Sequence, residues 1–145
     1  MSLSALRGRV VVLTFLYTNC PDVCPLTAEK LREARGKVGA VSDLALVAVS
    51  VDPRNDTPAS TREFLRAHRL EGAMRFLIGD EAALARVWQV YAIGSFPAGE
   101  RVVQHNDAIY LIDKQGRSRS LVHSDIEVEP LVTSLRVLLG EPRLF

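Results

Sequence analysis

The sequence has little of several things that mark particular classes of protein. No apolar run approaches the ~20 residues that a transmembrane helix needs. Lys and Arg number 18 and Asp and Glu 17, so no basic excess or polybasic run points to nucleic acid or a lipid surface. Cysteine occurs only twice in 145 residues, which excludes a disulfide framework for a chain of this size. The remaining composition, 48% hydrophobic, is that of a domain with a buried core.

The two cysteines, Cys20 and Cys24, lie close together within the stretch Tyr17–Pro25. This stretch follows the apolar run Arg9–Tyr17, a predicted buried strand, and precedes a predicted helix over Thr27–Lys37. The free amides and positive dipole at a helix start favour thiolate over thiol. Two thiols so placed could form a reversible disulfide or bind a soft metal ion. A third interpretation is that the two cysteines serve only as small buried apolar residues. Their position between a strand end and a helix start argues against this interpretation.

Strands alternate with helices along most of the chain. Thr57 is predicted to cap a helix whose first position is Pro58, and Ser95–Gly99 is predicted as a turn-rich loop. This order predicts an α/β fold in one domain, residues 1–145, with a central mixed, mostly parallel sheet flanked by helices. The other predicted strands are Leu44–Val51, Arg75–Ile78, Ala108–Ile112 and Arg119–Val122, and the other predicted helices are Ser60–His68, Glu81–Tyr91 and Val128–Leu139.

The spacing of the cysteines bears on which chemistry they perform. Three residues separate them, whereas a thioredoxin-type motif has two, so the analogy to thioredoxin is weakened but redox chemistry is not forbidden. A structural zinc site needs four ligands, and the chain has no second cysteine pair. Two thiolates with one imidazole suit copper better, as Cu(I) or, with an added axial group, as Cu(II).

Three histidines are candidates for the third ligand. His68 lies inside a predicted helix and is best explained as a solvated or partly packed side chain. His123 follows a predicted strand and could cap or hydrogen-bond near the last helix. His105 immediately precedes the predicted strand Ala108–Ile112, which we expect beside the first strand, so its loop would face the cysteines. From the residues alone, His105 is as well explained as a non-ligand as it is as the third ligand.

Three segments together resemble the Sco/SenC family of copper chaperones for cytochrome c oxidase assembly. They are the cysteine stretch Tyr17–Pro25, the segment Val49–Pro58, which reads VSVDPRNDTP, and the segment His105–Asp113, which reads HNDAIYLID. The order and separation of the three segments also fit, and the resemblance covers nearly the whole chain. It implies a thioredoxin-like fold that binds one copper ion.

The resemblance also implies ligands, partners and location. Its copper ligands carry over to Cys20, Cys24 and His105. Copper would pass from a donor protein to the copper-centre subunit of cytochrome c oxidase. The protein would be a monomer at the extracytoplasmic face of the bacterial inner membrane, in the periplasm, or in the mitochondrial intermembrane space. Because the first predicted strand begins near residue 10 with little before it, we expect a domain cut from a longer, membrane-anchored precursor.

Two functions remain open from the sequence. In the first, the chain is a metallochaperone that uses two thiolates and one imidazole. In the second, it is a thiol-disulfide oxidoreductase in which Cys20, the more exposed thiol, attacks a partner disulfide of the oxidase subunit and Cys24 resolves the mixed disulfide. A peroxidase would need an activated peroxidatic cysteine, and no activating set is identified. Asp52 is interpreted as a strand-ending Asp-Pro turn, with a role beside the metal site or toward a partner as the family alternative.

Overall fold

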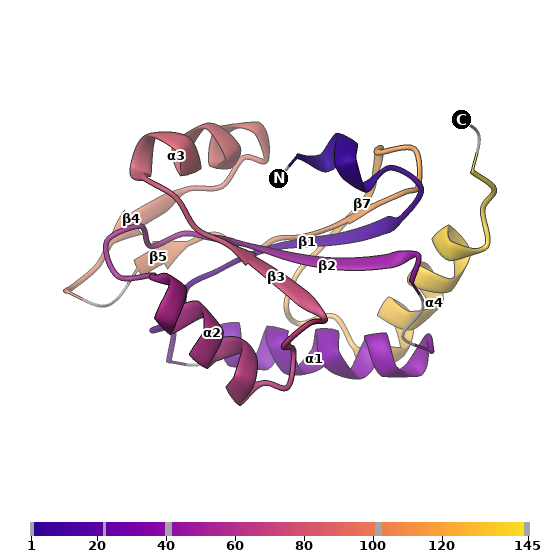
Figure 1. The fold of residues 1–145 in the computed structure, drawn as a ribbon, viewed down its shortest axis with the longest axis horizontal. Helices are drawn as coiled ribbons and strands as arrows, with labels where there is room; N and C mark the ends of the chain where they lie inside the picture. The colour runs from indigo at the N-terminus through magenta and orange to yellow at the C-terminus, as the bar shows by residue number, and fades with distance from the viewer. Residues whose placement is uncertain (1, 22, 40–41, 101–102, 144–145) are drawn as a thin grey trace.

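A five-stranded sheet forms the centre of the molecule (Figure 1). The structure, a computed structural model, describes residues 2–21, 23–39, 42–100 and 103–143. The order of strands across the sheet is β3-β2-β1-β6-β7. These strands are β1 (Val10–Leu16), β2 (Leu44–Ser50), β3 (Met74–Leu77), β6 (Ile109–Ile112) and β7 (Ser118–Val122).

The sheet is mixed, as the sequence predicts. β1 pairs in parallel with β2, and β2 with β3, whereas β6 pairs antiparallel with both β1 and β7. Four strands therefore run in one direction and β6 alone runs against them. The predicted position of β6 beside β1 is confirmed.

Helices cover both faces of the sheet. α1 (Val23–Lys37), α2 (Pro58–Ala67) and α4 (Val128–Leu139) lie on one face, and α3 (Glu81–Val90) and the short 3₁₀ helix η1 (Leu3–Leu6) lie over the other (Figure 1). All seven residues of β1 are buried, because this central strand has a layer on each side. The predicted α/β fold with flanking helices is confirmed.

Helix starts follow local chemistry. Thr57 caps α2 as predicted: its hydroxyl accepts the Ser60 N–H at 3.0 Å, and the Ser60 hydroxyl accepts the Thr57 N–H at 2.9 Å. α1 begins at Val23, four residues before the predicted start. Pro25 fits inside this first turn because an N–H there has no partner within the helix. Cys24 is therefore a helical residue.

A small second sheet was not predicted. β4 (Ser95–Pro97) and β5 (Val103–His105) form an antiparallel pair in which Ser95 lies opposite His105. The prediction of a turn-rich loop over 95–99 was wrong in this part. Each strand has only three residues and one ends in proline, so no periodic pattern marks them. Figure 1 shows this hairpin at the end of the molecule where β1 and β2 finish.

Candidate dithiol and metal centre

The two thiols lie where β1 gives way to α1. Cys20 is half-buried in the connecting loop, and Cys24 is completely buried in the first turn of the helix. The backbone N–H of Cys24 donates to the Sγ of Cys20 at 3.3 Å, and both residues are thiols rather than a disulfide. The predicted difference in exposure is confirmed. The outer sulfur receives a helix N–H, which stabilises negative charge on it.

The position of Cys24 at a helix start predicted a thiolate, but its surroundings favour the protonated thiol. Its interaction with the Cys20 thiol, and then its burial, raise the pKa of the Cys24 thiol well above its usual range. The negative charge of Asp56 adds to the effect. Metal binding must therefore displace a proton from Cys24.

Asp56 anchors the loop that carries the cysteines. One carboxylate oxygen accepts the Thr18 N–H at 2.9 Å and the Thr18 hydroxyl at 2.7 Å, and the other accepts the Ser50 hydroxyl at 2.6 Å. Burial raises the pKa of Asp56, although these hydrogen bonds act in the opposite direction. The loop after β1 is thereby tied to the end of β2. No sequence pattern predicted this role, because the groups that Asp56 contacts come together only in the folded chain.

Tyr17 links the thiols to the β4–β5 hairpin. Its side chain is buried, and its hydroxyl interacts with the backbone of Val103 and with Cys20. Burial, followed by the charges of the thiols, raises the pKa of Tyr17, and the bond from Val103 opposes this rise. The same ring meets the His105 imidazole edge to face, with ring centroids 5.8 Å apart. Tyr17 thus touches groups from both sides of the candidate site.

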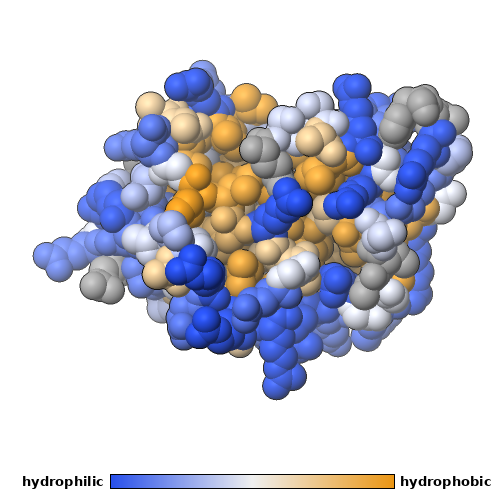
Figure 2. All heavy atoms as spheres, in the orientation of Figure 1, coloured by the Kyte–Doolittle hydropathy of each residue, from blue (hydrophilic) through white to orange (hydrophobic). Residues whose placement is uncertain are grey.

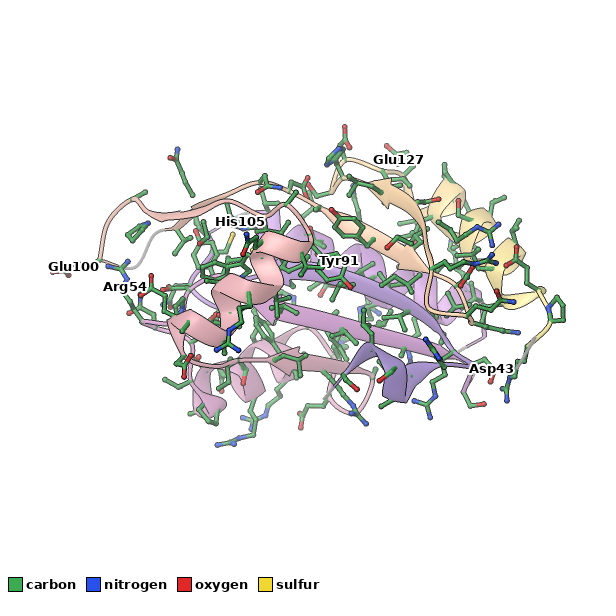
Figure 3. All side chains as sticks on the ribbon, turned by 90° about the horizontal axis from the view of Figure 1, so that it is seen from above. Asp43, Arg54, Tyr91, Glu100, His105 and Glu127 are labelled. Carbon is green, nitrogen blue, oxygen red and sulfur yellow. The ribbon has the colours of Figure 1, made fainter. Side chains whose placement is uncertain are left out.

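His105 ends strand β5 and is half-buried. Its Nδ1 lies 3.0 Å from the carbonyl oxygen of Asn106. Because a carbonyl only accepts, Nδ1 must carry the proton, and in the neutral ring Nε2 keeps a lone pair suited to a metal. Figure 3 shows His105 at the same end of the molecule as Arg54 and Glu100 and far from Asp43.

The structure brings the two cysteines together but does not complete a three-ligand set. Among the residues that it describes, no three His, Cys, Asp or Glu side chains lie close enough to hold a metal ion. The His105 ring packs on Tyr17, which itself contacts Cys20. Two sulfurs and one nitrogen are the donor chemistry that copper prefers, so the residue types fit copper. Their joint coordination requires His105 to move.

The other two histidines take part in local contacts. His68 follows α2, where its Nδ1 lies 2.9 Å from Glu29 and its ring packs on Phe64. His123 lies with its Nδ1 2.7 Å from the Asp107 carbonyl oxygen. Both arrangements agree with the non-ligand interpretation of these residues.

Asp52 follows β2 and shapes the turn there. Its carbonyl oxygen accepts the N–H groups of Asn55 and Asp56 at 3.3 and 3.0 Å, as a strand-ending turn would. Its carboxylate is 1% exposed; one oxygen accepts from the Asn55 side chain, and the other has no hydrogen-bond partner within the described part of the chain. The Nε of Arg54 lies 3.9 Å from the Oδ1 of Asp52.

The sequence matches the model of the SCO1/SenC family over residues 1–140. The chain belongs to the SCO1/SenC family. It is 31% identical to the SCO1 protein homolog of Bacillus subtilis, over 81% of this chain and 63% of that protein. It is 33% identical to the mitochondrial SCO2 homolog of Mus musculus, over 90% of this chain. The chain spans about half the length of the mouse relative, 53%.

The fold comparison agrees with membership of the SCO1/SenC family. The structure of Bradyrhizobium japonicum ScoI with copper bound has a TM-score of 0.81 to this chain at 30% identity, over 94% of this chain and 88% of that one. The predicted resemblance and thioredoxin-like fold are confirmed. None of the helices in the described ranges is both long and apolar enough to cross a bilayer.

Proposed function

We propose that this SCO1/SenC chain carries one copper ion through Cys20, Cys24 and His105 and delivers it to the binuclear copper centre of cytochrome c oxidase. The observation that carries the proposal is the dithiol itself, in which the Cys24 N–H donates to Cys20 Sγ at 3.3 Å. Cys20 is only partly buried, which allows an incoming ligand to compete for the ion. Transfer then proceeds by exchange of one thiolate at a time.

Copper is the ion that is transported and not a catalytic cofactor. The ligand residues therefore determine how it is bound and released. Loading displaces protons from the thiols, which couples affinity to pH. His105 leaves the face of Tyr17 to bring Nε2 toward the sulfurs. This movement makes the imidazole the ligand that is gained last and lost first.

Partners and location follow from the same proposal. A copper donor loads the site, and the copper-centre subunit of the oxidase receives the ion. We place the protein at the extracytoplasmic face of the bacterial inner membrane, or in the mitochondrial intermembrane space of a eukaryote. The resemblance of the cysteine, Val49–Pro58 and His105–Asp113 segments to Sco/SenC proteins supports this placement.

Anaerobic titration of the reduced protein with Cu(I), in competition with a chromophoric chelator, tests the proposal. We expect one tightly bound ion, loss of tight binding in Cys20→Ser and Cys24→Ser, and affinity at least about a hundredfold lower in His105→Ala, since even a partner of a ligand contributes 10–100-fold. His123→Ala is the matched control and should bind like the parent. Parental affinity in His105→Ala would refute the assignment of the third ligand.

A second candidate function is reduction of a partner disulfide, favoured by the contrast between an accessible Cys20 and a buried Cys24. The Cys20 thiolate attacks the partner disulfide, forming a mixed disulfide and releasing one partner thiolate. The Cys24 thiolate then attacks Cys20 Sγ and releases the second, so the partner gains two electrons and the chain becomes a disulfide. The raised pKa of Cys24 slows the second step, because only the thiolate attacks.

The Cys24→Ala variant tests this second function. We expect it to retain a model disulfide peptide as a stable adduct on Cys20, visible as added mass, because no resolving thiol remains. The parent should release the reduced peptide. No adduct on Cys24→Ala and no reduced peptide from the parent would dismiss the reductase function while leaving the copper proposal intact.

A further inference from the structure

A basic pocket lies at the end of the sheet opposite the dithiol. It has a volume of about 360 Å³ and includes Arg9, which precedes β1, and residues from the amino ends of β2 and β3. Asp43 immediately precedes β2 at this end, and Figure 3 shows it far from His105. The polar side chains that line the pocket are Arg9, Arg35, Arg75 and Ser42. Among the residues that the structure describes, no carboxylate lines it.

The three arginines have no counter-ion of their own in the part of the chain that the structure describes. Within the described ranges, none of their guanidinium groups has a hydrogen bond or ion pair to another residue, although most other arginines of the chain do. Acidic residues near these arginines in sequence are paired with other cations, such as Glu33 with Lys37 at 3.8 Å. Asp43 pairs with Arg143, and Glu71 pairs with Arg66 at 3.6 Å. The positive charge of the pocket is therefore uncompensated.

The three arginines come from different elements around the amino ends of the strands. Arg9 immediately precedes β1, and Arg75 lies on β3 opposite Val47 of β2. Arg35 reaches the same cavity from the last turn of α1. Because the three arginines lie far apart in the sequence, no run of basic residues predicts this pocket.

Three guanidinium groups around one cavity are suited to an oxyanion with several acceptor oxygens, which they can grip in bidentate fashion. We propose that Arg9, Arg35 and Arg75 form a binding site for a phosphate group. The group could belong to free phosphate or diphosphate, or to the head of an anionic phospholipid. The site is independent of the copper proposal, because it shares no residue with the dithiol centre.

The surroundings of the pocket favour the lipid source. An apolar groove of about 560 Å³ adjoins it, and Val47 lines both. This groove runs between η1 and α3, and Figure 2 shows hydrophobic side chains gathered on that face of the molecule. A charged cavity that continues into an apolar groove matches a molecule with a phosphate head and a hydrocarbon chain. The groove is lined chiefly by Leu13, Val49, Leu77, Leu84, Val87 and Val90.

Two binding measurements on the reduced full chain test the site. The first is calorimetric titration with inorganic diphosphate at low ionic strength. The second is co-sedimentation with phosphatidylcholine vesicles, with and without phosphatidylglycerol. We expect Arg9→Gln, Arg35→Gln and Arg75→Gln each to weaken binding at least about tenfold, the usual effect of losing a hydrogen bond to a charged group. The matched control Arg62→Gln removes an exposed, unpaired arginine on α2 and should change affinity less than twofold.

The outcomes separate the sources and can overturn the site. Binding only to diphosphate identifies free phosphate, and binding to phosphatidylglycerol vesicles that the three variants abolish identifies the lipid head. Arg75→Lys, which keeps the charge but not the planar fork, should recover only part of the affinity. Equal losses in Arg62→Gln, or no binding to either probe, would reject the site. Unchanged thermal midpoints establish that the variants are folded.

Discussion

At the scale of single residues, the surroundings of Cys24 alter its chemistry most. The neighbouring Cys20 thiol and complete burial raise the pKa of Cys24 above its ordinary value of 9.0. The unfolded chain therefore releases a proton near pH 9 that the folded chain keeps. The contribution of this residue to stability is complete below pH 9 and declines as the pH rises above it.

The difference between the pKa of Cys24 in the folded chain and in the unfolded chain predicts a pH-dependent loss of stability in the reduced protein. Between pH 9 and 10.5, the free energy of unfolding should fall faster in the parent than in Cys24→Ala, by up to ~1.4 kcal/mol per pH unit, the limit for one proton. Urea unfolding under argon measures both curves. Parallel curves for parent and variant would show that folding does not perturb the Cys24 thiol.

Asp56 is a second residue with a decisive local role. In Asp56→Ala, the Thr18 and Ser50 hydroxyl groups lose their acceptor, so we expect a loss of about 1–3 kcal/mol in the free energy of unfolding. Asp56→Asn keeps one acceptor oxygen for Thr18 and should lose less. Chemical denaturation at neutral pH measures both. Equal stability of parent and Asp56→Ala would contradict the anchoring role.

At the scale of elements, the β4–β5 hairpin positions His105 and is held at its base by the next residue. The Asn106 side chain accepts the Gly94 N–H at 2.5 Å and donates to the Ala92 carbonyl at 3.1 Å. These bonds tie the start of the β5–β6 connection to the end of α3. The hairpin is otherwise short, with three residues in each strand.

Removing this tie should loosen the hairpin. We expect Asn106→Ala to speed amide hydrogen exchange in β5 about fivefold or more, because two hydrogen bonds of about 1 kcal/mol each are lost. Gln104→Ala, at an exposed position of the same strand, is the matched control. Exchange measured by mass spectrometry that is equally fast in both variants would remove Asn106 from its anchoring role.

Element by element, most of the fold could be predicted from patterns in the sequence. Buried apolar runs predicted β1 and β2 of the large sheet, and the Thr57-Pro58 pair predicted the start of α2. The predicted start of α1 at Thr27 was four residues late, because α1 begins at Val23. The β4–β5 hairpin was missed because strands of three residues have no measurable period.

Part of the candidate site could likewise be predicted from the sequence, and part could not. Residue type and spacing singled out Cys20 and Cys24, and resemblance to a family singled out His105. The contacts of Asp56 and Tyr17 had no such signal, because they join residues that meet only across the folded sheet. The basic pocket was equally hidden, since its three arginines are far apart in sequence.

At the scale of the whole molecule, α4 holds the fold together by packing under β1 and against α1. Leu135→Ala, at a position 1% exposed, should cost 2–5 kcal/mol in the free energy of unfolding, through lost burial and the cavity left behind. Val137→Ala, 58% exposed on the same helix, should change it by less than about 0.5 kcal/mol. Similar losses in both variants would mean that α4 does not pack as described.

The two ends of the molecule have separate chemistry: the dithiol lies where β1 and β2 finish, and the basic pocket lies where β1, β2 and β3 begin. X-ray absorption at the copper edge tests copper carriage by this chain. With one Cu(I) per reduced chain, we expect two sulfur neighbours and one imidazole nitrogen, with the nitrogen absent in His105→Ala. An unchanged nitrogen signal in His105→Ala, or a copper environment without two sulfurs in the parent, would contradict it.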